Sequence, residues 1–142
     1  MVEKRIETFE DLDVYQRMVE LHLEVHKLTL RFPIFERYEL GSQLRRSSNG
    51  SPANLAEGWN NKHVNVYLEG INRALGELRE TRHHLQMAFR KGYLEQKQIQ
   101  SFLARYDECG RMLRGLEKSL ERRRDGQRAS PTSSHLRPKS SK

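Results

Sequence analysis

Two groups of residues have the spacing of metal ligands on a helix. His22 and His26 are four residues apart, the separation at which two imidazoles on one helix face can share an ion. The residue after His22 is a leucine, whereas a zinc-protease helix has a glutamate at that position. Glu80 and His83 form one Glu-x-x-His motif, but a di-iron bundle needs two such motifs and two further glutamates. We therefore expect no metal and no cofactor.

The sequence also lacks the motifs of common catalytic sites. It has neither a Gly-rich phosphate loop nor a G-x-S-x-G turn. The one cysteine, Cys109, stands at helical spacing from Tyr106, Met112 and Leu113, which is typical of a core residue and not of a reactive thiol. We therefore expect a protein that is not an enzyme, and a metal-dependent bundle enzyme is the least favoured alternative.

Arginines on the third predicted helix, residues 62–91, are candidates for binding chemistry. On a helical wheel of 100° per residue, Arg79 and Arg90 lie on one flank of the apolar stripe. Arg82 falls inside the stripe, where an unpaired guanidinium would be too costly. We expect Arg82 to pair with an acid such as Glu57 or to face a channel shared between subunits. Guanidinium groups bind phosphate oxygens, so these arginines are candidate nucleic-acid contacts.

Two further groups of arginines extend this candidate surface. Arg45 and Arg46 are consecutive, so their side chains diverge from one helix. Arg122, Arg123 and Arg124 begin a basic C-terminal segment. The alternative interpretation is that these are ordinary solvated arginines, balanced by neighbouring acids.

The positive charge is concentrated at the C-terminal end. The net charge is +7, from 26 lysines and arginines against 19 aspartates and glutamates. Residues 121–142 carry +5 of this excess, which leaves only +2 for residues 1–120. Residues 125–142 combine proline, serine, glycine and charge with almost no apolar side chains, so we expect a disordered basic tail there. It is either a basic arm for nucleic acid or a solubilising or artificial extension.

Four segments have apolar residues at every third or fourth position, which predicts helices at 11–31, 36–59, 62–91 and 95–123. Short turns join them. The sequence therefore predicts an all-α protein, an antiparallel up-and-down four-helix bundle over residues 11–124, preceded by an N-terminal segment of residues 1–10. Neither a membrane span nor a signal peptide is visible, so we expect a cytoplasmic protein.

The first predicted helix has an unusually wide apolar face. One stripe runs from Val14 to Phe32, and a second lies beside it, made of Leu12, Tyr15, Val19 and His22. A face wider than one neighbouring helix requires favours burial against another subunit. The alternative is that the helix packs between two others of its own bundle.

Proline and glycine mark special positions in the second and third predicted helices. Pro52 removes a backbone donor from a helix interior, so we expect the second helix to be kinked or interrupted there. Gly70 and Gly76 each cost about 1 kcal/mol relative to alanine in a helix, and close approach of a neighbouring helix would compensate. Gly92 is expected to end the third helix in a left-handed cap.

The block around Pro52 resembles a known family. Arg45 and Arg46, then five residues, then the run from Pro52 to Gly58 are similar to the R-R-x(5)-P-A-N-I-A-E-G block of a bacterial four-helix-bundle family. That family is encoded in intervening sequences of 23S ribosomal RNA genes and is related to accessory variability proteins of diversity-generating retroelements. The resemblance covers about residues 9–120. It implies structural roles for a further set of positions, which are Pro52, Asn54, Glu57, Gly58, Gly76 and Gly92.

The resemblance also implies a homopentameric barrel with a positively charged surface that associates with nucleic acid, and a reverse-transcriptase partner in the retroelement relatives. This chain departs from the family pattern at two places. It has glutamate replaced by Arg82, and it has polar residues where small or apolar ones are usual, namely Ser47, Ser48, Asn49 and Ser51. We expect this polar run to weaken the core-facing surface of the second helix.

Together these features predict a non-enzymatic, oligomeric four-helix bundle that binds RNA or DNA through backbone phosphates. The retroelement relationship would make it an accessory to a reverse transcriptase. The alternative is a protein-interaction scaffold that docks a partner protein without direct nucleic-acid binding.

Overall fold

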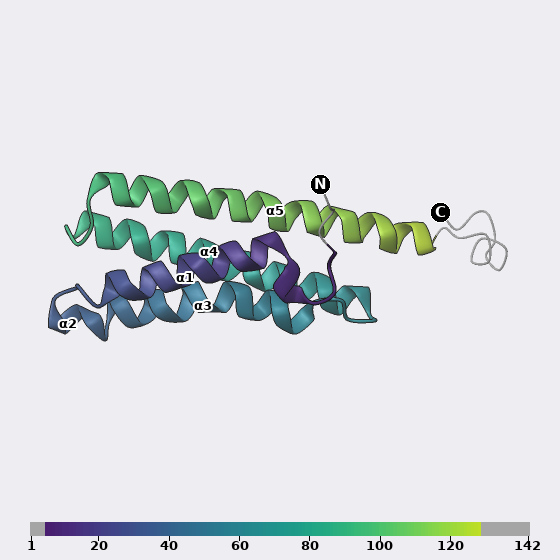
Figure 1. Ribbon diagram of the computed structural model, residues 1–142, viewed down its shortest axis with the longest axis horizontal. Helices are drawn as coiled ribbons and strands as arrows, with labels where there is room; N and C mark the ends of the chain where they lie inside the picture. The colour runs from purple at the N-terminus through teal and green to yellow at the C-terminus, as the bar shows by residue number, and fades with distance from the viewer. Residues whose placement is uncertain (1–4, 129–142) are drawn as a thin grey trace, which may run out of the picture.

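The chain folds into a bundle of four long helices. The computed structural model describes residues 5–128. Within that range the elements are a 3-10 turn and five α-helices, namely η1 (Phe9–Asp11), α1 (Asp13–Thr29), α2 (Ile34–Arg37), α3 (Leu40–Gly58), α4 (Val64–Arg90) and α5 (Gln96–Arg128). Figure 1 shows α1, α3, α4 and α5 side by side, with α5 extending past the other three toward the C-terminus. The predicted all-α bundle is confirmed, and residues 5–128 contain no strand.

Two helix boundaries differ from the predicted ones. The second helix is divided, because Tyr38 and Glu39 separate the single turn α2 from α3. Helix α5 continues to Arg128, so residues 125–128 are helical and the expectation that disorder begins at 125 was wrong. Gln127 and Arg128 are good helix formers, and the helix continues through Asp125 and Gly126 despite their low helix propensity. The rest of the predicted tail, residues 129–142, lies outside the described residues.

The predicted apolar stripes form one continuous core. The stripe of α1 that begins at Val14 is buried, and Cys109 and Tyr106 of α5 are fully buried beside it. The second stripe of α1 packs inside the same bundle, because Leu12 and Tyr15 are half-buried against the core. Internal packing therefore accounts for part of the wide face of α1, and its burial against a second subunit stays a prediction.

The second helical segment is bent, as expected, but the helix is not interrupted at Pro52. Pro52 lies buried in the interior of α3, which stays helical from Leu40 to Gly58. A nearby side chain adds a hydrogen bond in this stretch, since Asn54 Nδ2 donates to the Gly50 carbonyl oxygen at 2.8 Å. The structural roles that the resemblance implies for Pro52 and Asn54 stay predictions.

Three residues of the polar run of α3 are buried and hydrogen-bonded to neighbouring helices, which the sequence did not predict. Ser47, Ser48 and Ser51 are all fully buried. Ser51 Oγ donates to the Ala74 carbonyl oxygen of α4 at 3.2 Å, and Ser47 Oγ accepts from Thr81 Oγ1 at 2.8 Å. Small hydroxyls that find partners on the facing helix can be buried without the cost of an unpaired polar group. Asn49, the fourth residue of the run, is exposed.

Helices α3 and α4 approach most closely at a pair of glycines. A Cβ on Gly70 would lie 2.9 Å from the Asn54 carbonyl oxygen and 3.2 Å from the Gly58 Cα. The predicted close approach is therefore confirmed for Gly70, and the residue facing it on α3 is Gly58. It was wrong for Gly76, where a Cβ would meet nothing within 4 Å. Gly92 has φ +85° and ends α4 in the predicted left-handed cap, with Tyr93 N donating to the Ala88 carbonyl oxygen.

Candidate nucleic-acid interface

The arginines predicted to bind phosphate do not gather on one surface, and Arg45 serves the fold. Its Nη1 donates to Thr29 Oγ1 at 2.8 Å and its Nη2 donates to the Arg37 carbonyl oxygen at 2.8 Å. These two bonds connect α3 to the end of α1 and to α2. Because both ends of the guanidinium are engaged in the fold, Arg45 is a structural residue.

Arg46 is exposed but is surrounded by acids. It forms ion pairs with Glu77 and Glu80, both on α4. His84 also lies 3.2 Å from Glu80, so this surface of α3 and α4 carries charges of both signs. An arginine that already has two carboxylates beside it attracts a phosphate only weakly.

A pocket between α4 and α5 is lined by more arginines than acidic residues. Its volume is about 240 Å³, and we call it the arginine groove. Its apolar floor includes Leu75 and Leu78 of α4 and Tyr106 of α5. Its charged residues come from both helices at intervals of three and four residues, and these are Arg79, Arg82, Asp107, Arg111 and Arg114. Residues at such intervals share one helix face, so each helix presents a row of charge to the groove.

Arg82 has the acidic partner that the sequence required, but the partner is Asp107 of α5. The Nη2 of Arg82 lies 3.3 Å from Asp107 Oδ1. Glu57 was wrong as the expected partner, because it lines a separate pocket of α3 and α4 together with Arg73. The Nε of Arg82 is buried and has no hydrogen-bond partner. Arg82 is therefore paired with Asp107 through one Nη, while its buried Nε has no partner among residues 5–128.

The other arginines of the groove have no acid beside them. Arg79, Arg111 and Arg114 are exposed, and residues 5–128 provide none of them with an ion pair. Three uncompensated guanidinium groups around one pocket create a local positive field in a domain whose charges are otherwise nearly balanced. Their planar donors match phosphate oxygens.

Of the four arginines that line this groove, the sequence pattern predicted Arg79 and Arg82 as contacts but not Arg111 and Arg114. The signal for the missed pair was available, because Asp107, Arg111 and Arg114 recur at helical spacing on the fourth predicted helix.

The remaining predicted contacts lie at the two ends of the bundle. Arg90 is exposed on the last turn of α4. Arg122 and Arg123 are exposed near the far end of α5. Arg124 is half-buried there, with its Nη1 donating to Asn65 Oδ1 of α4 at 3.2 Å and its Nε donating to Asp125. These residues therefore lie outside the arginine groove and do not form a single site with it.

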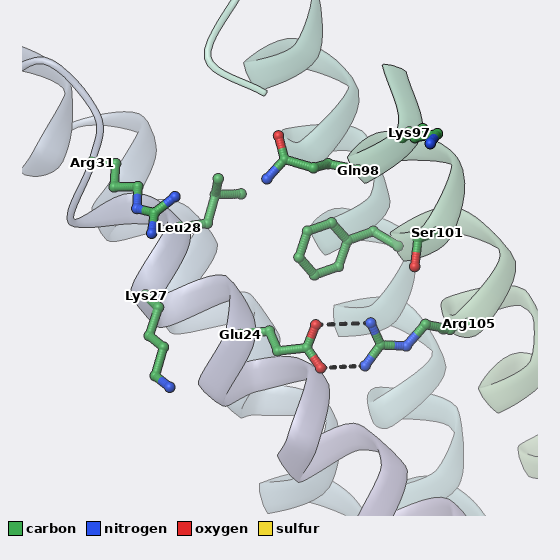
Figure 2. A pocket seen from close by; sticks show the side chains of 9 residues that line it. Glu24, Lys27, Leu28, Arg31, Lys97, Gln98, Ser101 and Arg105 are labelled. Carbon is green, nitrogen blue, oxygen red and sulfur yellow. Dashed lines mark hydrogen bonds and ion pairs between the residues drawn. The ribbon is translucent and has the colours of Figure 1, made fainter. Parts of the chain in front are cut away.

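A second basic pocket lies on the other flank of α5, against α1, and has a volume of about 380 Å³. We call it the α1–α5 pocket. Figure 2 shows Glu24 of α1 and Arg105 of α5 pointing toward each other across one end of it. The two Nη atoms of Arg105 donate to the two carboxylate oxygens of Glu24, at 2.8 and 2.5 Å, and this hydrogen bonding lowers the pKa of Glu24. The pair is self-neutralising, so the remaining cations set the sign of the pocket, and these are Lys27, Arg31 and Lys97.

Catalytic groups do not gather in the described part of the chain. Residues 5–128 contain no cluster of three histidine, cysteine, aspartate or glutamate residues able to hold a metal ion. His22 Nδ1 lies 2.8 Å from Ser48 Oγ, and burial, with a smaller effect of His26, lowers the pKa of His22. Cys109 is buried in the core, as predicted, and burial raises the pKa of its thiol to about 11. A thiol with so high a pKa is a poor nucleophile.

Comparison with known proteins adds one positive match. The family model described as 23S rRNA-intervening sequence protein matches residues 10–115. That span includes α1 to α4, most of α5 and every residue that lines the two basic pockets. A search of curated proteins gave no match. None of the helices in residues 5–128 is long and apolar enough to cross a membrane.

Proposed function

We propose that this chain, which belongs to the 23S rRNA-intervening sequence protein family, is a non-enzymatic protein that binds the phosphate backbone of RNA or DNA along α5. The observation that carries this proposal is the arginine groove. Arg79, Arg111 and Arg114 lie there without acidic partners, and Arg82, paired with Asp107, lines the same groove. Phosphate diesters supply the acceptor oxygens and the negative charge that these groups lack.

Binding of this kind would be independent of sequence. Guanidinium contacts to phosphate oxygens hold a nucleic acid in place but do not distinguish its bases. Because such contacts release counterions, affinity falls steeply as salt is raised. A chain with a small net charge on its folded part would therefore depend on local concentration of charge, either within one groove or across several copies.

We also propose that the chain is a homo-oligomer, with a pentamer as the assembly that the family resemblance implies. Support comes from an apolar surface at one end of the bundle, formed by Ile34, Phe35 and Tyr38, which are 73, 71 and 77 % exposed. The buried Glu36 holds this turn in place, because its carboxylate accepts from Lys91 Nζ and from Tyr93 Oη, both at 2.9 Å. An exposed apolar cluster held so firmly fits packing against a second copy. Light scattering of the purified protein would give the number of subunits, and a monomer at micromolar concentration would contradict this part.

The binding test compares two variants with equal charge change. The first replaces Arg79, Arg111 and Arg114 with glutamine. The second replaces Arg17, Arg46 and Arg73 with glutamine, each of which is exposed and already ion-paired. Affinity for a structured RNA is measured between about 50 and 200 mM salt, a range over which phosphate binding weakens by orders of magnitude. The groove variant should lower the slope of log affinity against log salt by about 2 to 3.

The matched variant should leave most of that slope in place, because its arginines are already paired with acids. Equal losses in both variants would mean that net charge and not the groove governs binding. A native affinity that does not respond to salt would contradict the proposal altogether.

A protein-interaction scaffold is the second candidate function, and the same exposed apolar turn of α2 favours it. In that case a partner protein, such as a reverse transcriptase, would cover the surface of Ile34, Phe35 and Tyr38. A pull-down with and without nuclease distinguishes the two functions, because a protein contact survives removal of nucleic acid.

A further inference from the structure

We propose that the α1–α5 pocket holds one unstacked nucleotide of a single-stranded RNA or DNA, with its base on an apolar floor and its phosphate at Arg31. This inference rests on the proposed nucleic-acid-binding function and assigns it a second, chemically different subsite. The two pockets flank the same helix, α5, but they differ in size and lining. The α1–α5 pocket, at about 380 Å³, is large enough for a small organic group, whereas the arginine groove, at about 240 Å³, is smaller than most such sites.

The floor of the pocket is apolar and aromatic. It is formed by Leu28 of α1 and Phe102 of α5, which are 7 and 6 % exposed. The guanidinium of Arg105 lies over the Phe102 ring at 6.0 Å from its centroid, held there by the ion pair with Glu24. Aromatic and guanidinium planes are the surfaces on which unpaired bases stack. A phosphate group alone gains nothing from such a floor.

Polar groups stand beside this floor with free hydrogen-bonding capacity. Gln98 Oε1 accepts from the backbone N–H of Glu95 at 2.8 Å at the start of α5, which fixes the side chain and leaves its amide N–H₂ available. Ser101, one helical turn before Arg105, lines the same pocket and is exposed. Figure 2 shows the Gln98 amide reaching into the space between α5 and α1. Donors in these positions suit the carbonyl and ring-nitrogen acceptors of a base edge.

The cations around the opening supply the phosphate contact. Arg31, just after α1, points toward the pocket in Figure 2, while Lys27 extends away from it and Lys97 lies on the α5 side of the pocket. All three are exposed, and residues 5–128 give none of them an ion pair. The combination of an aromatic floor, fixed donors and an outer cation matches a whole nucleotide. A base paired within a duplex is stacked on both faces and could not enter.

The test uses three oligomers with equal numbers of phosphates. These are a ten-nucleotide oligouridine, the same backbone with every base removed, and a duplex of matched charge. Fluorescence polarisation at low salt should show the native protein binding oligouridine about 5- to 100-fold more tightly than the abasic oligomer, the range expected for stacking of one base. The duplex should bind no more tightly than the abasic oligomer.

A pair of serine variants locates the effect. Ser101→Phe fills the pocket from an exposed position, and Ser119→Phe makes the same change at another exposed position of α5 that does not line it. Ser101→Phe should bring oligouridine and abasic affinities within about twofold of each other, and Ser119→Phe should leave the preference unchanged. Arg31→Gln, which does not alter the floor, should weaken both oligomers together.

The outcomes separate the subsite from the underlying function. Equal binding of oligouridine and the abasic oligomer by the native protein would overturn the nucleotide subsite while leaving phosphate-backbone binding intact. A base preference that survives Ser101→Phe would place base recognition elsewhere and would also overturn it. Failure of every oligomer to bind would contradict the proposed function itself.

Discussion

Polar residues are paired at the contact between α3 and α4, whereas several are left unpaired on the two flanks of α5. Between α3 and α4, Ser47 and Ser51 are buried and hydrogen-bonded, and Gly58 and Gly70 bring the backbones together. Along α5, by contrast, arginines line pockets, and Arg111 has no acidic partner within residues 5–128. Polar groups that satisfy one another stabilise a fold, whereas polar groups left over are available for a ligand.

The difference also separates the family resemblance from the function. The block that carries the resemblance, from Arg45 to Gly58, lies entirely in α3. The structure uses that block for packing, with Arg45 bonded to Thr29 and Gly58 against Gly70. The candidate site lies instead on α4 and α5, so the most recognisable residues are not the ones that we expect to bind.

The largest effect on the α3–α4 contact should come from Gly70→Ala. A Cβ at this position would lie 2.9 Å from the Asn54 carbonyl oxygen, which is backbone and cannot rotate away. We expect a loss of roughly 1 to 3 kcal/mol in the free energy of unfolding, as for other over-packed positions. Chemical denaturation measures it.

Gly76→Ala, on the same helix, is the matched control. Its Cβ would meet nothing within 4 Å, so the substitution should stabilise the protein by up to about 1 kcal/mol through helix propensity. Equal effects of the two substitutions would mean that the glycine contact is not the tight point of the fold.

A smaller loss is expected from Thr81→Val. Thr81 Oγ1 lies 2.8 Å from Ser47 Oγ, and both residues are fully buried. Removal of the hydroxyl leaves Ser47 without its partner across the helices and should cost about 1 to 2 kcal/mol in unfolding free energy. The double variant Ser47→Ala with Thr81→Val should recover part of that loss, because it leaves no unpaired hydroxyl. A double variant whose losses simply add would show that the two hydroxyls are energetically independent.

The smallest effect is a pH dependence at the contact between α1 and α3. The pKa of His22 is lowered on folding, so the unfolded chain takes up the proton at a higher pH than the folded protein does. His22 therefore contributes its full stability above about pH 6.5, the usual histidine pKa, and that contribution falls as the pH drops below it. Denaturation midpoints are measured between about pH 7.5 and 5. In the His22→Gln variant the midpoint should depend less on pH than in the native protein. His83→Gln, at an exposed histidine, should retain the native pH dependence.

Sequence periodicity was enough to predict the four long helices, because burial repeats along each one at the spacing of a helix turn. It could not separate Gly70 from Gly76. Both glycines stand in the same helix, and only the position of α3 decides which one is close to a neighbour. The end of α5 was missed for a related reason, since a polar composition predicted disorder where the chain continues as a helix to Arg128.

The candidate site was predicted only in part, because its contacts join residues far apart in the sequence. The stripe position of Arg82 correctly required an acidic partner, but choosing Asp107 over Glu57 needed the relative position of α4 and α5. The buried serines were interpreted as a weakness because their partners Thr81 and Ala74 are on another helix. Residue type indicated which groups require a hydrogen-bond or ion-pair partner, and the fold determined which residue is that partner.

Arginine-selective chemical footprinting tests most directly whether the flank of α5 is the binding surface. The full-length protein is treated with phenylglyoxal with and without a structured RNA at low salt, and modification at each arginine is measured by mass spectrometry. Bound RNA should protect Arg79, Arg111 and Arg114, while Arg46 and Arg73, which lie on α3 and α4 outside the groove, stay as reactive as before. Protection confined to Arg46 and Arg73, or none at any arginine while RNA is bound, would contradict the account.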